Sequence, residues 1–504
     1  MSRTKNSIRN ISVAFISNII IVIVGFLAQK VFLNVLGEEY NGINGLFSNL
    51  ISMLSVVELG LGTAIIYNLY KPIAENDIEH IKSLMYFYKK SYQIISLVVF
   101  ILGLCIMPFL PIIIGEISIE ENIYIIYLLF LFDTCLSYLL VYKQSILNGY
   151  QKNHIVNLVY LLYIIIFNAA NIIILLTTGS YYLYLVAKLI FRFSQNFLIK
   201  IIADKYYPFI NEKAKGLDKN VKNDIIKKIK ALLVHKVGSM AIIGSDNVMI
   251  SMLIGISTVG FYQNYKMIIS QIQNLFSQVF TSITSSVGNL IIQNDLDKNK
   301  EVYKKLSFAN FWLSTFCSIS LYLCISPFIT LWIGDKWLLE ESVVIALVIN
   351  FFLLTLRSST GCFKDAAGIY YEDRHVPFIE LTVNIFFSVA LSKTCGLTGI
   401  FVGTVISNFV IHLYSFPKFV VTTVIGQSYK EYFVNFIKKN IVFLFVLIIS
   451  SLFKKIILFD SVLLNLVLSM FFSIVIPNLF LFLLYRNKEE FSYFKSLVKG
   501  RIKF

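Results

Sequence analysis

The sequence predicts an all-α polytopic membrane protein with about fourteen transmembrane helices, arranged as two parallel six-helix repeats followed by two C-terminal helices. Three observations predict this fold: an excess of apolar residues, a one-sided distribution of basic residues, and motifs that return after six predicted spans. Of the 504 residues, 57% are hydrophobic and 14% are charged, and the mean hydropathy is +0.74. A soluble domain has about 45–50% apolar and about 25% charged residues. The composition therefore excludes a soluble enzyme, a disordered protein and a domain with a single membrane anchor.

The apolar segments follow one another along nearly the whole chain, with short loops between most of them. A helix needs about 20 predominantly apolar residues to cross a bilayer. The first segment follows a basic stretch, MSRTKNSIRN, that has no small-residue cleavage site after it, so we expect a retained first span and not a removed signal peptide. The predicted spans are 11–35, 44–68, 92–114, 123–142, 155–176, 182–202, 232–253, 258–283, 307–332, 342–366, 376–392, 398–415, 440–457 and 462–485.

Basic residues gather on one side of the predicted membrane. The N-terminus, every second loop and the C-terminal tail contain 33 lysines and arginines, whereas the opposite loops with their adjoining span ends contain four: Lys336, Lys393, Lys454 and Lys455. By the positive-inside rule, both termini are predicted to be cytoplasmic. The net charge of +15 then faces the anionic headgroups of the inner leaflet, and a nucleic-acid partner is not needed to explain it.

Loop lengths and missing motifs narrow the kind of function. No outer loop is long enough to form a domain, which argues against a membrane glycosyltransferase or polysaccharide polymerase. We find no P-loop, HExxH, nucleophile elbow or Rossmann glycine motif, and the six cysteines form no CxxC pair. We therefore predict no enzymatic activity, no cofactor and no metal site. The predicted domains are an N-lobe (1–202), a cytoplasmic linker (203–231), a C-lobe (232–415) and a segment (416–504) with the last two spans and a basic cytoplasmic tail.

The first twelve predicted spans contain an internal duplication. The motif that runs from Leu102 to Glu116 returns from Leu321 to Asp335, and both copies read Leu-x-Leu-Cys-Ile-x-Pro-Phe-x5-Gly before the closing acid. Since six spans return the chain to the same side, the two halves would be parallel repeats about an axis normal to the membrane, and transporters built this way bind substrate between their halves. Further matches at a similar displacement pair Gly37 and Gly42 with Gly255 and Gly260, Gly149 with Gly368, and Thr178-Gly179 with Thr398-Gly399.

Ionisable residues within the predicted spans are the candidate functional residues. Each costs about 3 kcal/mol at the bilayer centre, so they must face a wet interior or one another. The basic candidates for binding an anionic, phosphorylated substrate are Lys30, Lys188, Arg192, Lys236, Lys266 and Arg357. The acidic candidates, which could bind a coupling ion or be static partners of a base, are Glu58, Asp133 and Asp246.

Spacing separates the basic candidates. Lys188 and Arg192 are four residues apart, so they share a helix face and form a cationic strip. Arg192 could alternatively form a structural pair with Asp133 or Glu58. Arg357 has no acid within one helical turn, and a guanidinium of this kind suits bidentate binding of a phosphate.

Several segments together resemble the polysaccharide transporter family of the multidrug/oligosaccharidyl-lipid/polysaccharide exporters, the Wzx-type flippases. The resemblance extends over essentially the whole chain. It is carried by Leu36-Gly37 with Tyr40 and Gly42, Glu58-Leu-Gly-Leu-Gly-Thr-Ala64, His235-Lys236 with Asp246, and Gly260-Phe-Tyr-Gln-Asn-Tyr265. Its longest part runs from Arg357 through Phe363-Lys-Asp365, Asp373-Arg374, Pro377, Glu380 and Asn384 to Gly396, Gly399 and Gly403-Thr404.

The resemblance implies a two-lobe transporter of the bacterial plasma membrane that works by alternating access. The implied cargo is an undecaprenyl-pyrophosphate-linked oligosaccharide, moved to the outer leaflet for capsule, O-antigen or exopolysaccharide synthesis, with a polysaccharide polymerase and other export proteins as partners. Lys30 occupies a position where relatives often have arginine. The alternative is a cation-coupled multidrug or metabolite exporter of the same architecture, which should have an acidic or aromatic cavity.

Overall fold

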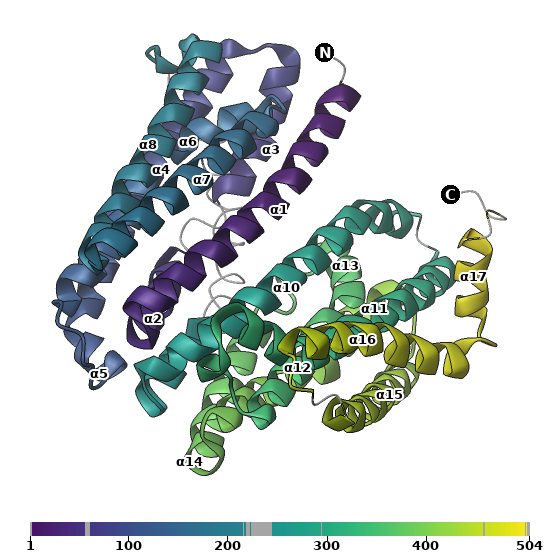
Figure 1. Cartoon of the computed structure of the whole chain (residues 1–504). Helices are drawn as coiled ribbons and strands as arrows, with labels where there is room; N and C mark the ends of the chain where they lie inside the picture. The colour runs from purple at the N-terminus through teal and green to yellow at the C-terminus, as the bar shows by residue number, and fades with distance from the viewer. Residues whose placement is uncertain are drawn as a thin grey trace. The chain divides into compact units, whose positions relative to one another are not determined.

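The computed structural model describes residues 3–55, 61–214, 216–217, 222, 244–293, 295–456, 459–498 and 500, with side chains for all of these except 3–16, 61–67 and 497–498. Every regular element in the described residues is a helix (Figure 1), which confirms the prediction of an all-α fold. Nine helical segments among those residues are long and apolar enough to cross a membrane. The chain is therefore a multi-pass membrane protein.

The chain divides into two compact units, Met1–Gly260 and Phe261–Phe504. The predicted domain boundaries near residues 202, 231 and 415 remain predictions. The first unit contains α1 (Arg3–Leu36), α2 (Glu38–Leu54), α3 (Leu61–Glu75), α4 (Ile78–Ile106), η2 (Met107–Phe109), α5 (Leu110–Ile114), α6 (Ile123–Gly149), α7 (Asn153–Thr178), α8 (Tyr181–Tyr206) and η3 (Pro208–Asn211). α10 (Ile256–Ile291) begins in the first unit.

The second unit continues from α10 to the C-terminus. It contains α11 (Leu296–Ile333), η4 (Asp335–Trp337), α12 (Glu341–Leu356), α13 (Ser358–Ala367), α14 (Val376–Val410), the π-helical segments η5 (Ile411–Ser415) and η6 (Pro417–Ile425), α15 (Tyr429–Ile456), α16 (Val462–Tyr485) and α17 (Glu489–Val498).

Small polar residues define where several helices begin. A side-chain oxygen at the N-cap accepts a hydrogen bond from a backbone N–H of the first turn, which would otherwise have no intrahelical partner. Asp77 caps α4 through the N–H of His80, and Ser180 caps α8 through the N–H of Leu183. Asp295 caps α11 in the same way.

The duplicated proline motif ends at a glycine turn in both units, but the helix before that turn differs between the two units. Gly115 and Gly334 both have positive φ, 72° and 99°, a conformation that side chains disfavour. Before Gly115, the helix breaks into η2 and α5, whereas Pro327 lies inside the continuous α11. The difference follows from a second proline, Pro111, because Thr330 at the equivalent position keeps its N–H for the helix.

The two predicted spans 376–392 and 398–415 together form α14 and η5. A sharp turn inside α14 separates the two spans. Gly396 makes this turn with φ 54° inside α14. The two segments then pack as a hairpin through small residues, since a Cβ on Gly399 would collide with the backbone of Leu391 and one on Gly403 would collide with Ser388. Small residues allow such close backbone approach between membrane helices. The turn is therefore at Gly396, and Gly399, which the sequence match placed at the junction, is a packing residue.

A second close approach joins α2 to the first turn of α10 within the first unit. A Cβ on Gly42 would collide with the carbonyl oxygen of Ile256, and one on Gly260 would collide with the carbonyl oxygen of Glu38. The Asn41 amide also donates to the carbonyl of Gly260 at 2.7 Å. Glu38 and Gly42 lie 218 residues before Ile256 and Gly260, respectively, so the two glycine contacts are equivalent under the sequence repeat.

We expect Gly42→Ala or Gly260→Ala to lower the free energy of unfolding by about 1–3 kcal/mol, because the added methyl group forces the two backbones apart. The measurement is the thermal unfolding midpoint of the purified full chain in detergent micelles. Gly361→Ala is the matched control, since a Cβ at this helical glycine meets no atom within 4 Å. Equal midpoints for all three variants would contradict the close packing.

Candidate functional site

The predicted cationic strip on α8 faces a carboxylate on α6. These two helices lie side by side in the first unit (Figure 1). The Lys188 ammonium is 4.0 Å from Asp133 Oδ2, and the Arg192 Nε is 3.8 Å from Asp133 Oδ1. We call these three residues the Asp133 cluster. The helical spacing of four residues is what brings both cations to one acid.

The Asp133 cluster has a surplus of one positive charge, since one carboxylate faces two cations. Both distances are too long for hydrogen bonds. Asp133 Oδ1 and Arg192 Nε are buried and have no hydrogen-bond partner among the described residues. Aromatic faces complete the surroundings, with Lys188 Nζ 4.5 Å from the Phe130 ring centroid and the Arg192 guanidinium carbon 5.8 Å from that of Tyr163. The cluster therefore has unused hydrogen-bonding capacity and net positive charge.

A cavity of about 330 Å³ opens beside Arg192, between α6, α7 and α8. Its lining is rich in amide groups, from Gln144, Asn157, Gln195 and Asn196. The side-chain oxygen of Gln195 is buried without a hydrogen-bond partner in the described part of the chain. Amides beside a guanidinium suit a ligand that combines hydroxyl groups with a negative charge.

Arg357 in the second unit is paired with an acid that is distant in sequence. Its Nη2 donates to Glu380 Oε1 at 2.5 Å, 23 residues away, and to the carbonyl oxygen of Asn408 at 3.3 Å. Both side chains are largely buried, with 18% and 7% of their surfaces exposed. The charge of Arg357 is thus matched one to one, but its Nε is buried without a hydrogen-bond partner among the described groups.

The remaining candidates are on other helices or lie outside the described structure. Lys30 is exposed on α1. Lys266 on α10 is half-buried, with Nζ 5.7 Å from the Tyr262 ring centroid, and Asp246 is buried. Lys236 and Glu58 lie outside the described residues.

Three contacts show partners that the spacing along the chain did not reveal. The carboxylate nearest to Arg357 is on α14, and Lys364 bonds to Asp373 while its neighbour Asp365 accepts a hydrogen bond from Tyr370. The spacing does not identify these partners, because the first contact depends on how α12 packs against α14 and the other two depend on how the turn after α13 folds. Among the described residues, no three histidine, cysteine, aspartate or glutamate side chains gather to hold a metal ion.

Comparison with known proteins gives matches at the level of the fold. No family model matches the chain, and no curated protein sequence matches it. Among solved structures, the chain is similar to lipid II flippase MurJ in an inward closed conformation, with a TM-score of 0.67 and 16% identity over 94% of this chain and 99% of that one.

Two further structures are transporters. The first is an inward-facing multidrug resistance MATE family transporter of the MOP superfamily, with a TM-score of 0.59 and 14% identity over 80% of this chain and 94% of that one. The second is a MOP superfamily transporter from Pyrococcus furiosus with a binding pocket of reverse polarity, with a TM-score of 0.53 and 15% identity over 81% of this chain and 92% of that one. The chain therefore has the fold of MOP superfamily transporters.

Proposed function

We propose that the chain is a flippase that moves an undecaprenyl-pyrophosphate-linked oligosaccharide across the bacterial plasma membrane by alternating access. The observation that carries this proposal is the Asp133 cluster, in which two cations share one carboxylate beside a cavity lined with amides. A pyrophosphate would supply the missing negative charge, and sugar hydroxyls would bond to the amides. The fold supports a lipid cargo, since one structure that it matches is named as a lipid flippase.

Each basic residue has a part in this proposal. Lys188 and Arg192 hold the pyrophosphate, because they are the pair with surplus charge. Arg357 donates a hydrogen bond to the cargo from its Nε, which has no other partner in the described structure, while its Nη2 stays bonded to Glu380. Lys30, Lys236 and Lys266 complete the set of proposed ligands. The product would enter surface polysaccharide synthesis, with a polymerase and export proteins acting downstream.

The second candidate is a cation-coupled exporter of drugs or metabolites. Two observations favour it: the buried carboxylate of Asp133, and the similarity to a structure named as a multidrug resistance transporter. The charge balance opposes it, because a carboxylate beside two cations binds a further cation weakly. Asp133, Glu58 and Asp246 remain the candidates for binding H⁺ or Na⁺ in either mechanism.

The double variant Lys188→Ala/Arg192→Ala is expected to slow translocation of a fluorescent polyprenyl-pyrophosphate oligosaccharide at least tenfold in proteoliposomes, because both proposed phosphate ligands are lost. Arg192→Lys should retain part of the rate, since it keeps the charge but loses the planar fork. Arg374→Ala is the control, because this exposed arginine follows α13 outside the cluster. A double variant as fast as the wild type would count against the site.

Asp133→Asn distinguishes the two candidate functions. Loss of the carboxylate leaves Lys188 and Arg192 facing each other, so we expect the empty variant to unfold at a lower temperature than the wild type. Pyrophosphate should raise the unfolding midpoint of the variant more than that of the wild type, because a ligand that binds the native state more tightly stabilises it more. If instead Na⁺ stabilised the wild type and not the variant, Asp133 would be assigned to cation coupling.

A further inference from the structure

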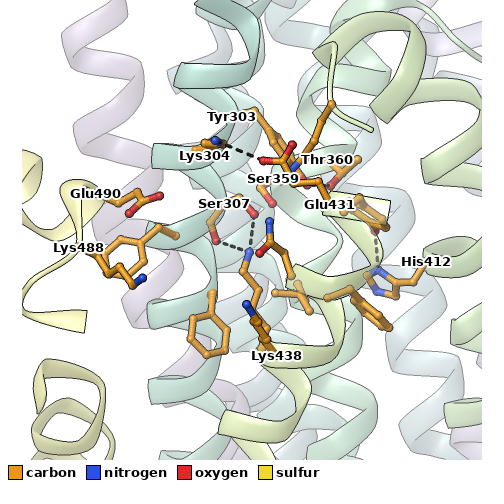
Figure 2. A pocket seen from close by; sticks show the side chains of 18 of the residues that line it. Tyr303, Lys304, Ser307, Ser359, Thr360, His412, Glu431, Lys438, Lys488 and Glu490 are labelled. Carbon is orange, nitrogen blue, oxygen red and sulfur yellow. Dashed lines mark hydrogen bonds and ion pairs between the residues drawn. The ribbon is translucent and has the colours of Figure 1, made fainter. Parts of the chain in front are cut away.

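A second polar hollow lies entirely within the second unit. No proposed cargo ligand is among the described residues that line it, although Leu356 and Ser359, which flank Arg357 and Ser358, are. It has a volume of about 330 Å³ and lies between α11, α13, α15 and the start of α17 (Figure 2). Ser307 from α11, Ser359 and Thr360 from α13, and Lys438 from α15 meet around it. The hollow is thus formed mainly by the C-terminal helices that follow the two repeats and by the helices they cover.

Lys439 is the inward-facing cation of this hollow. Its Nζ donates to Ser307 Oγ at 2.6 Å and to the carbonyl oxygen of Ser307 at 3.2 Å. Both acceptors are uncharged, and no carboxylate within the described structure lies at ion-pair distance from Lys439. An ammonium group has three N–H donors, so one donor and the whole positive charge are left for a ligand.

The charged residues that line the hollow favour an anion. Four lysines stand against two glutamates, which leaves a surplus of two positive charges; these residues are Lys304, Lys438, Lys439, Lys488, Glu431 and Glu490. Glu431 is already shared, because Lys300 and Lys304 approach it at 2.8 and 3.3 Å. Hydroxyl groups of Ser307, Ser359 and Thr360 add hydrogen-bond donors around the same space. Lysines and hydroxyls in this arrangement suit a phosphate group.

An apolar groove adjoins the hollow and shares the side chain of Phe308 with it. The groove has a volume of about 400 Å³ and lies along α11, with α16 and α17 on its other side. Trp312, Phe491 and Phe494 line it, and the Trp312 indole N–H donates to Asn478 Oδ1 at 2.7 Å. A phosphate site next to a groove of aromatic and aliphatic side chains matches an amphipathic ligand.

We propose that these two hollows together bind one lipid, with its phosphate beside Lys439 and an acyl chain along Trp312. The lipid comes from the leaflet that the basic loops face, where anionic headgroups attract lysines. The inference does not depend on the proposed cargo, since neither the Asp133 cluster nor Arg357 takes part in the binding. It assigns the C-terminal helices a function of their own, as walls of a lipid site.

The test uses the fluorescence of Trp312 in the full-length protein. Since the chain has three tryptophans, Trp332→Phe and Trp337→Phe leave Trp312 as the only tryptophan, and its indole is excited selectively over the tyrosines. The protein in maltoside micelles is titrated with phosphatidylglycerol brominated on its acyl chains, and separately with diacylglycerol carrying the same chains. We expect phosphatidylglycerol to quench Trp312 at a concentration at least tenfold lower than diacylglycerol. Equal quenching by the two would overturn the phosphate site.

Variants of Lys439 connect the quenching to the headgroup. Lys439→Gln should raise the half-quenching concentration of phosphatidylglycerol at least tenfold, and Lys439→Arg should restore it. Lys430→Gln is the matched control, because Lys430 is exposed on the same helix and does not line the hollow. The unfolding midpoint of each variant reports whether it is folded. A folded Lys439→Gln protein that binds phosphatidylglycerol like the wild type would refute the proposal.

Competition identifies the source of the phosphate. The two competitors are unbrominated polyprenyl phosphate and unbrominated phosphatidylglycerol. If the polyprenyl phosphate relieves quenching at the lower concentration, the carrier lipid is the ligand, and if phosphatidylglycerol does, the bulk phospholipid is the ligand. Both results support the lipid site. Glycerol 3-phosphate that competes as well as either lipid would overturn it, because the acyl chain would then contribute nothing.

Discussion

An ionised side chain among apolar helices must find an opposite charge, a set of polar groups or water, and this constraint explains where the charged residues lie in the structure. Arg357 meets it with a single acid, Glu380, at 2.5 Å. Asp133 meets it with two cations and so leaves a positive surplus. Lys439 meets it with two neutral oxygen atoms of Ser307. The three arrangements differ in how much charge remains unmatched, and the last two are the proposed anion sites.

The repeat in the sequence has a counterpart in the contacts of the backbone. Gly42 approaches the carbonyl of Ile256, and Gly260 approaches the carbonyl of Glu38, which is equivalent to Ile256 in the sequence repeat. The contact between α2 and the first turn of α10 is therefore reciprocal. Gly115 and Gly334 repeat the same positive-φ turn. Such positions disfavour a side chain, either because two backbones touch or because φ is positive. Glycine therefore preserves the duplication where apolar residues could exchange freely.

The two proposed anion sites agree with the proposal that the protein binds lipids both as cargo and as surroundings. The cavity beside Arg192 is lined with amides, as a sugar-bearing ligand requires. The hollow beside Lys439 is lined with hydroxyls and lysines, and Phe308 lines both this hollow and an apolar groove, as the proposed lipid ligand requires. The difference in lining gives each site its own ligand chemistry.

Composition and local patterns alone determined the all-α membrane fold, the split of spans 376–392 and 398–415, and the shared helix face of Lys188 and Arg192. These properties depend on apolar length and on helical periodicity, both of which act between residues near one another in the chain. Only the tertiary structure decided that Glu380 neutralises Arg357, that Gly396 and not Gly399 makes the hairpin turn, and that Lys439, one of a run of loop-side lysines in the sequence, turns inward. Those outcomes depend on which segments pack together. The energy of pairing two charges or two backbones depends on their separation in space, and the spacing along the chain does not give that separation.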